Sequence, residues 1–158
     1  MQRNLANFDR LVARRLAAQM WGQPDHQRKL ADGIWFFSTP RHGGIIVDTD
    51  VWPAILQVRE ANEVFVRADS KWKAADEQHF VALEEDCDAA IAEWLFTDAI
   101  LTQKFQEKYG TYPFPFDEWR KQRVENIRRS LEQWNPDVLR VFPEANMGTK
   151  LTEKEPAD

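Results

Sequence analysis

GIWFFSTPRHGGIIVD, at residues 33–48, contains two short runs of aromatic and β-branched residues on either side of a group of turn-forming residues. Runs of this kind, at 34–37 and 45–47, predict the two strands of a β-hairpin. Neither run alternates cleanly between apolar and polar residues, which indicates that both faces of the strands are covered. The hairpin is therefore expected at the centre of a sheet that has helices packed against it.

The segments on either side of the hairpin supply the remaining elements. Two further short apolar runs predict strands at 64–66 and 79–83. Apolar residues at helical spacing, with capping residues before them, predict helices over 4–20, 52–60, 86–110 and 117–134. Thr97 and Asp98 could divide the third of these, and Asn135-Pro136 begins one more helical turn.

These elements predict an α+β fold with a small, mostly antiparallel sheet of about four strands and flanking helices. We expect a single domain over 1–143, and a flexible polar tail over 144–158, because helical periodicity is lost after Pro143. The residues expected to face the core from the first and last long helices are Leu5, Phe8, Leu11, Val12 and Leu16, and Val124, Ile127, Leu131 and Trp134.

The composition argues against several classes of protein, among them nucleic-acid binders, disulfide-rich proteins and membrane proteins. The 158 residues carry a formal net charge of −5, which is the wrong sign for an obvious nucleic-acid binder. A single cysteine excludes an intramolecular disulfide framework. Without an apolar leader or a run long enough to span a bilayer, we expect a cytoplasmic protein that does not bind membranes. Seven Trp and ten Phe predict a ring-rich core or an aromatic contact surface.

The turn of the hairpin is the first candidate site. Pro40 presets the bend, and Gly43 and Gly44 suit a tight closure, so turn chemistry accounts for these three residues. It does not account for Arg41 and His42, which are expected at the tip of a rigid hairpin. There they could contact an anion or a carboxylate of a partner, and His42 could act as an acid or base near neutral pH.

A second candidate site is the segment Glu84-Glu85-Asp86-Cys87. One alternative function is a small hydrolase or transferase that uses His42 with an acidic residue such as Glu84, or with Cys87. Against this, Cys87 is in helical phase with Ile91, Trp94 and Leu95, which predicts a buried, unreactive thiol. The carboxylates suit the start of a helix, and no candidates show the spacing of metal ligands, so no cofactor or metal is expected.

The helix over 117–134 supports another alternative, nucleic-acid binding, through Arg120, Lys121, Arg123, Arg128 and Arg129. Three glutamates are interleaved with these cations, and this mixture is more typical of a solvated helix face with side-chain pairs. Exposed aromatics are expected at Trp72, in a polar loop, and in the proline-rich segment 112–116, which cannot be helical. The candidate partner-binding residues are Arg41, His42, Trp72, Tyr112 and Phe114.

Two motifs taken together, Ser-Thr-Pro-Arg-His-Gly-Gly at 38–44 and Glu-Glu-Asp-Cys at 84–87, carry a resemblance. Over residues 30–96 the chain resembles a domain of unknown function found in proteins of plasmids, phages and other mobile elements. The resemblance implies that Arg41 or His42 faces the acidic segment across the sheet edge. It also implies a mobile element as the genetic setting. Small size, one domain, abundant aromatics and the lack of a complete catalytic constellation then give the leading hypothesis, a non-enzymatic binding protein of a mobile element that inhibits or modulates a host or defence protein.

Overall fold

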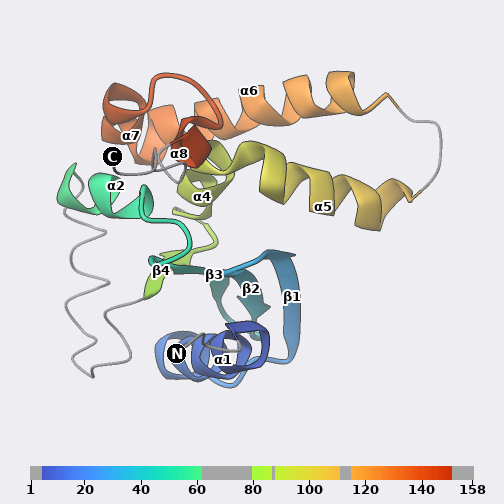
Figure 1. The fold of residues 1–158 in the computed structure, drawn as a ribbon, viewed down its shortest axis with the longest axis vertical. Coiled ribbons are helices and arrows are strands. Elements are labelled where there is room, and N and C mark those ends of the chain that lie inside the picture. Colours follow the sequence, from blue (N-terminus) through green and yellow to red (C-terminus); the bar gives the residue numbers. More distant parts are fainter. Residues whose placement is uncertain (1–4, 62–79, 87, 111–114, 151–158) are drawn as a thin grey trace, which may run out of the picture.

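A computed structural model describes residues 5–61, 80–86, 88–110 and 115–150. Its centre is an antiparallel sheet in the order β1-β2-β3-β4, so strands adjacent in the chain are also adjacent in space (Figure 1). The strands are β1 (His26–Ala31), β2 (Ile34–Ser38), β3 (Gly43–Asp48) and β4 (Phe80–Glu84). The predicted α+β class, the four-stranded sheet and the hairpin at its centre are confirmed.

Helices lie on both faces of the sheet. Before it comes α1 (Leu5–Trp21), and between β3 and β4 comes α2 (Ile55–Ala61). The helices after β4 are α4 (Ala89–Leu95), α5 (Thr97–Tyr109), α6 (Phe116–Trp134), α7 (Pro136–Val141) and α8 (Met147–Lys150). Figure 1 shows α1 on one side of the sheet and α2, α4, α5 and α6 on the other, with α5 and α6 running side by side.

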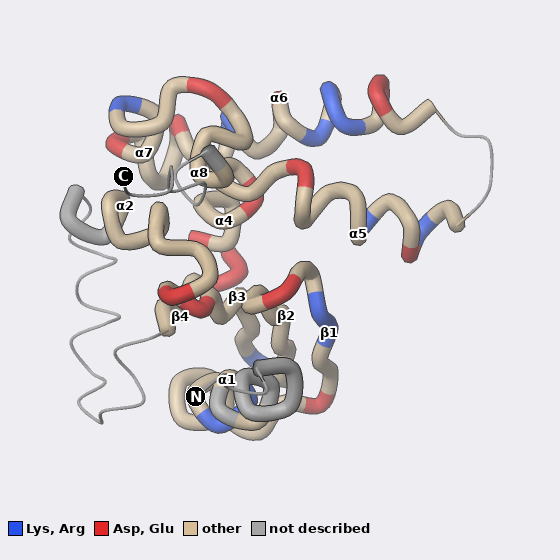
Figure 2. Tube along the Cα trace, in the orientation of Figure 1, with Lys and Arg blue, Asp and Glu red and all other residues tan. Residues whose placement is uncertain are grey.

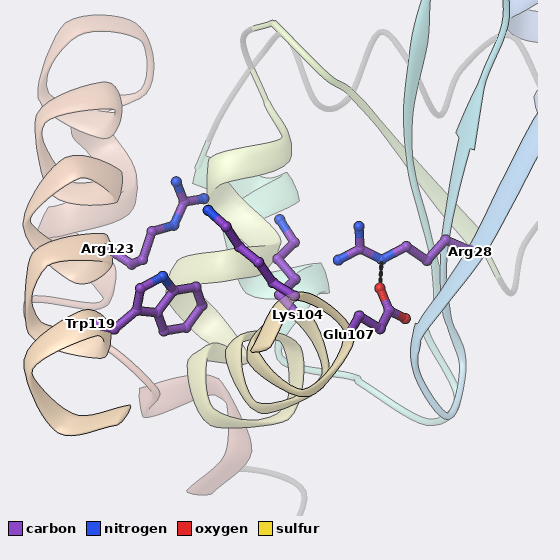
Figure 3. Close-up of a pocket in the computed structure, with 6 residues that line it drawn as sticks. Arg28, Lys104, Glu107, Trp119 and Arg123 are labelled. Atoms are coloured by element: carbon purple, nitrogen blue, oxygen red, sulfur yellow. Dashed lines mark ion pairs between the residues drawn. The ribbon is translucent and has the colours of Figure 1, made fainter. Parts of the chain in front are cut away.

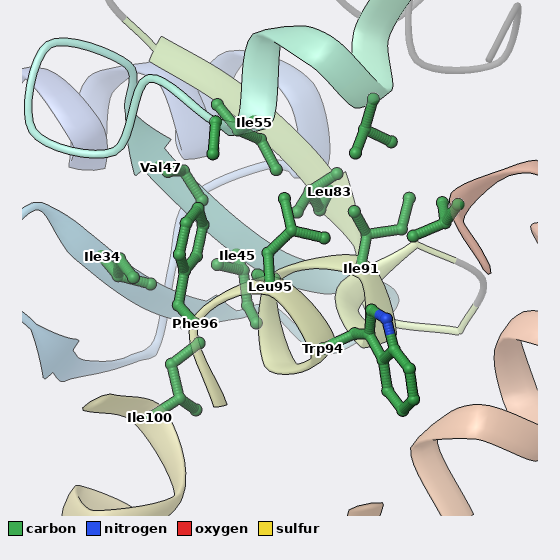
Figure 4. Packing of buried hydrophobic residues seen from close by; sticks show 14 of the residues in the cluster. Ile34, Ile45, Val47, Ile55, Leu83, Ile91, Trp94, Leu95, Phe96 and Ile100 are labelled. Carbon is green, nitrogen blue, oxygen red and sulfur yellow. The ribbon is translucent and has the colours of Figure 1, made fainter. Parts of the chain in front are cut away.

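Successive residues of β3 explain this layering, because side chains alternate between the two faces of a strand. Ile45 and Val47 belong to the larger core beneath α4, whereas Ile46 belongs to a smaller core beneath α1. All six residues of β3 are buried, as expected for a strand covered on both faces. Figure 4 shows the larger core, where sheet residues meet Ile91, Leu95 and Phe96.

Strand β1 is the element that the sequence did not indicate. Its sequence HQRKLA has four polar residues in succession, and only Leu30 is buried. It forms the edge of the sheet, pairs with β2 and has an irregularity between Lys29 and Ala31. A polar edge strand is held in the sheet by main-chain hydrogen bonds rather than by burial of its side chains, so its sequence shows no apolar pattern. The strand expected at 64–66 lies outside the described residues.

The long helix expected over 86–110 is divided near Thr97, as the sequence allowed. Helix α4 ends before Phe96, whose φ of −118° and ψ of 42° are not helical, and α5 begins at Thr97. The buried Thr97 hydroxyl donates a hydrogen bond to the carbonyl of Trp94 at 2.7 Å. The division lets α4 pack on the sheet and on α6 while α5 takes a different direction along β1.

Three expectations about burial were wrong. Leu11 is 64% exposed, because α1 packs through Ala13, Leu16 and Ala17, and Leu11 lies about 200° around the helix from Ala13. Trp134 is 54% exposed, since α6 ends there and buried Asn135 and Val138 continue the contact with the core.

The third wrong expectation about burial concerns the polar segment after Pro143. Residues 144–150 are not a free tail, because Asn146 N–H donates to the Trp94 carbonyl at 2.8 Å and Gly148 is buried against Leu95 and Phe96. Within the described residues, no helix combines the length and apolarity needed to span a bilayer.

Candidate functional site

The hairpin tip is held by Thr39. Its Oγ1 accepts hydrogen bonds from the backbone N–H of His42 at 3.0 Å and of Arg41 at 3.3 Å. The same hydroxyl lies 2.7 Å from the His42 carbonyl and 3.2 Å from the Trp21 carbonyl, either of which can accept its proton. The Thr39 N–H also donates to the His42 carbonyl at 2.7 Å. This network explains why the tip can be rigid although Pro40, Arg41 and His42 are exposed.

The tip and the acidic segment do lie together at one edge of the sheet. Glu85 N–H donates to the Gly43 carbonyl at 2.9 Å, and His42 Nδ1 lies 3.8 Å from Glu84 Oε1. The resemblance implied such a pairing, and the structure places it between His42 and Glu84. Both side chains are about half exposed, at 55% and 46%, so solvent screens the pair and it contributes little to stability.

A buried polar contact follows the acidic segment. Asp88 is 7% exposed and its Oδ1 accepts a hydrogen bond from Asn135 Nδ2 at 3.2 Å, which joins the start of α4 to the junction of α6 and α7. Burial raises the pKa of the Asp88 carboxyl above its usual value, the Asn135 hydrogen bond lowers this pKa in part, and the nearby Glu84 charge raises it again. Cys87, the proposed nucleophile of the enzyme alternative, lies outside the described residues.

The largest collection of converging charged groups lies elsewhere, between β1, α5 and α6. A cavity of about 470 Å³ is lined there by Arg28 of β1, by Lys104, Glu107 and Lys108 of α5, and by Trp119 and Arg123 of α6. We call these six residues the cationic groove. Figure 3 shows Trp119 and Arg123 projecting from α6 on one side, Arg28 projecting from β1 on the other, and the residues of α5 between them.

Two carboxylates organise the cations of the cationic groove. Glu93 of α4, whose side chain is 11% exposed, forms an ion pair with Lys104 Nζ and lies 3.8 Å from Arg123 Nη2. Glu107 forms an ion pair with Arg28. Arg28 and Lys104 also line a neighbouring hollow of about 280 Å³ that extends toward Glu85 and Glu93. The side chains are thus held in place before any ligand arrives, which reduces the entropy lost on binding.

Charge in the cationic groove is unbalanced. Four cations, Arg28, Lys104, Lys108 and Arg123, face only the two carboxylates Glu93 and Glu107. Arg123 Nε is buried and makes no hydrogen bond within the part of the chain that the structure describes. Arg28 Nε also lacks a hydrogen bond there, because its contact with Glu107 is an ion pair without hydrogen-bond geometry. Glu107 nevertheless neutralises Arg28, so the feature of the groove that favours an anion is the excess of two positive charges among the residues that line it or pair with them.

Aromatic rings form one end of the cationic groove. The Phe105 ring lies 4.9 Å from that of Tyr109, 5.1 Å from that of Phe116 and 5.3 Å from that of Trp119, measured between ring centroids. The contacts with Phe116 and Trp119 are edge-on, a geometry that aromatic pairs favour. The cluster fixes Trp119 at the position where α5 and α6 approach each other.

The basic helix of the sequence, now α6, does not present a stripe of free cations. Arg120 pairs with Asp98 at 2.7 Å, and Arg128 and Arg129 pair with Glu125 at 2.9 and 3.6 Å. Acidic and basic residues alternate along the helix in Figure 2, as the interleaved glutamates predicted. Arg123 alone among these cations lines the groove. This position of Arg123 could not be predicted from the sequence, because its partners come from β1, α4 and α5.

Several predicted site residues are not placed by the structure. Trp72, Tyr112 and Phe114 lie outside the described residues, so their assignment as partner contacts stays a prediction. Arg41 is exposed and makes no ion pair with a described residue. Among the residues that the structure describes, no three His, Cys, Asp or Glu side chains come close enough together to hold a metal ion.

Comparison with known proteins places the chain in a family without a described activity. Residues 14–156 match DUF7007, a domain of unknown function, and the chain therefore belongs to that family. The match covers the hairpin, the cationic groove and most of the helices, and extends well beyond the residues 30–96 expected from the two motifs. No curated protein and no solved structure matches the chain.

Proposed function

We propose that this chain is a non-enzymatic binding protein that receives an acidic segment of a partner protein in the cationic groove. The observation that supports this proposal is the groove itself, where four cations outnumber the two carboxylates that pair with them among the described residues. An arginine guanidinium binds a carboxylate through two parallel hydrogen bonds, and such charge-assisted bonds are stronger than neutral ones. The preorganised cations would therefore favour a partner that carries Asp or Glu at its contact point.

The partner that we propose is a cytoplasmic host or defence protein, with the chain acting as a product of a mobile element that inhibits or modulates it. This part of the proposal rests on the motifs at 38–44 and 84–87 and on the resemblance that they carry. The hairpin tip, with Arg41 and His42 exposed on a backbone fixed by Thr39, offers a second contact for the same partner.

The geometry gives less support to the two alternative functions. In a nucleophilic site a third group orients the base through a hydrogen bond, whereas His42 Nδ1 and Glu84 Oε1 are 3.8 Å apart at an exposed edge. Nucleic-acid binding through α6 would need cations free to neutralise phosphates, yet Arg120, Arg128 and Arg129 are paired with carboxylates. We therefore do not propose either alternative.

A charge-matched pair of double variants tests the proposed binding. Lys108→Gln/Arg123→Gln removes two cations from the groove and leaves the Glu93–Lys104 and Arg28–Glu107 pairs in place. Lys121→Gln/Arg15→Gln removes two cations from exposed positions on α6 and α1. Binding of a fluorescein-labelled peptide rich in Asp and Glu is measured by anisotropy. We expect the groove variant to bind about tenfold more weakly or worse, and the control variant to bind like the unchanged chain.

Binding should also weaken as salt is raised, because the contacts that carry it are electrostatic. Equal weakening in the two double variants would assign the effect to net charge alone and would contradict the proposal. So would the failure of the folded, unchanged chain to bind any acidic peptide at low salt.

A further inference from the structure

We propose that the anion selected by the cationic groove is a phosphate monoester of a molecule that also carries an aromatic ring; this inference rests on the binding function proposed above and names the ligand chemistry of the same site. A phosphotyrosine side chain and a nucleoside monophosphate both present this combination. The groove offers a match for each part of such a ligand: a surplus of positive charge, an arginine whose side chain is partly exposed, and an aromatic side chain beside it.

The charge of the groove fits a dianion better than a carboxylate. Glu107 pairs with Arg28, and Glu93 is shared between Lys104 and Arg123 Nη2. The four cations of the groove therefore exceed the two carboxylates by two positive charges. A carboxylate would neutralise only one of them. A phosphate monoester carries about −1.5 to −2 charges at pH 7 and has three acceptor oxygens, so it can neutralise both.

Arg123 supplies the directional part of the site. Its side chain is 39% exposed overall, although its Nε is buried. The Nε is thus enclosed, whereas the exposed part of the guanidinium can meet a ligand. Planar guanidinium groups bind phosphate oxygens through two N–H groups at once.

Glu93 does not prevent a phosphate from entering. Its carboxylate is 11% exposed, is paired with Lys104 and lies 3.8 Å from Arg123 Nη2, so its charge is largely compensated from within the protein. Glu107 is compensated by Arg28 in the same way. Their effect is to hold Lys104 and Arg28 at fixed positions along the sides of the groove.

Trp119 supplies the contact for a ring. It lies one helical turn before Arg123 on α6, and side chains four residues apart project from the same face of a helix. Phe105 and Tyr109 meet the indole edge-on and Phe116 at 32°, so Trp119 is fixed within the cluster while it still lines the groove. A ligand ring could pack against the indole while its phosphate reaches Arg123 and Lys108. The cavity of about 470 Å³ is within the range of sites for small molecules.

Isothermal titration calorimetry with four small probes tests the ligand class: phenyl phosphate, inorganic phosphate, benzoate and phenol. We expect phenyl phosphate to bind at least tenfold more tightly than each of the other three, because it alone offers both the ring and the dianion. Lys108→Gln/Arg123→Gln should abolish this preference, and Lys121→Gln/Arg15→Gln should retain it. Unchanged thermal melting of each variant shows that the loss is not caused by unfolding. Phenyl phosphate that binds no better than benzoate or inorganic phosphate would overturn the proposal.

Two further comparisons distinguish a phosphorylated protein from a free nucleotide as the source of the phosphate. They also distinguish failure of the phosphate inference from failure of the proposed binding function. Adenosine monophosphate is compared with an acidic peptide that contains phosphotyrosine and with the same peptide containing tyrosine. A tighter complex with the phosphorylated peptide identifies a modified protein, and a tighter complex with the nucleotide identifies a free metabolite; either supports the ligand class. If both peptides bind in the groove equally, the phosphate inference fails and the proposed function stands. If no probe or peptide binds, both fail.

Discussion

Gly44 is the residue at which a single methyl group should do most harm to the sheet. A Cβ built there would lie 2.2 Å from the Leu83 carbonyl oxygen in β4 and 2.6 Å from two atoms of the Trp21 ring. The carbonyl belongs to the β3–β4 pairing and cannot move away without breaking it. We therefore expect Gly44→Ala to lower the free energy of unfolding by about 3 kcal/mol or more.

Gly110→Ala is the control for that substitution. Gly110 has a φ of +57° and a ψ of −128°, and nothing lies within 4 Å of its Cβ position, so alanine there adds only backbone strain, about 1–3 kcal/mol. Urea denaturation of the two variants measures the difference. If Gly44→Ala were no less stable than Gly110→Ala, the close approach of β3 to Trp21 and β4 would be wrong.

For individual residues of the hairpin tip, the turn itself could be predicted from the sequence, but the hydrogen bonds that hold it could not. Pro40 and the glycines follow from turn chemistry, and turn formers between two apolar runs are a local signal. The role of Thr39 was not apparent, because its hydroxyl is also close to a carbonyl of Trp21, 18 residues earlier. Contacts between residues so far apart in the chain leave no mark in the local pattern.

The segment after α7 gives a prediction at the scale of elements. A chain that ends at Pro143 loses the hydrogen bond that Asn146 donates to Trp94 and the two hydrogen bonds between Asn146 and Asp98, one donated by each residue. It also loses the packing of α8 against Leu95 and Phe96. We expect its free energy of unfolding to fall by about 3 kcal/mol, from lost hydrogen bonds and newly exposed apolar surface. A chain that ends at Lys150 keeps every one of these contacts and is the control. Equal unfolding midpoints in urea for the two chains would show that α8 does not stabilise the core.

Elements with an apolar signal could be predicted, and those without one could not. The central hairpin, α1 and α6 were found because their apolar residues recur at the period of the element that they form. Strand β1 was missed because an edge strand needs few apolar side chains, and α8 was missed because it packs through a glycine. The expected aromatic strand and loop at 64–72 lie outside the described residues.

At the scale of the whole molecule, the cationic groove shows why the site was less predictable than the fold. Its cations belong to β1, α5 and α6, and the carboxylate that pairs with two of them belongs to α4. In the sequence, Lys104, Lys108 and Arg123 each have acidic neighbours and resemble ordinary solvated residues. Only the packing of four elements brings them together, and sequence periodicity does not specify that packing.

Asp88 joins the start of α4 to the α6–α7 junction through its hydrogen bond with Asn135. We therefore expect its ionisation to affect the stability of the whole fold. Burial raises the pKa of its carboxyl in the folded state, with a further contribution from Glu84 and an opposing one from Asn135. A carboxyl whose pKa is raised by folding destabilises the folded state when it is ionised. That penalty is present at neutral pH and is removed as pH falls through the folded-state pKa toward the unfolded value, about 3.9.

Asp88→Asn keeps an oxygen that can accept from Asn135 Nδ2 and removes the charge. We therefore expect this variant to melt at a higher temperature than the unchanged chain at pH 7.5, and the difference to shrink steadily as pH is lowered to 4.5. Asp88→Ala is the control, because it removes the charge and the acceptor together and should melt below Asp88→Asn at every pH. Calorimetric melting between pH 4.5 and 7.5 measures all three chains. If the difference in melting temperature between Asp88→Asn and the unchanged chain did not vary with pH, burial of the ionised Asp88 carboxylate would not destabilise the folded state.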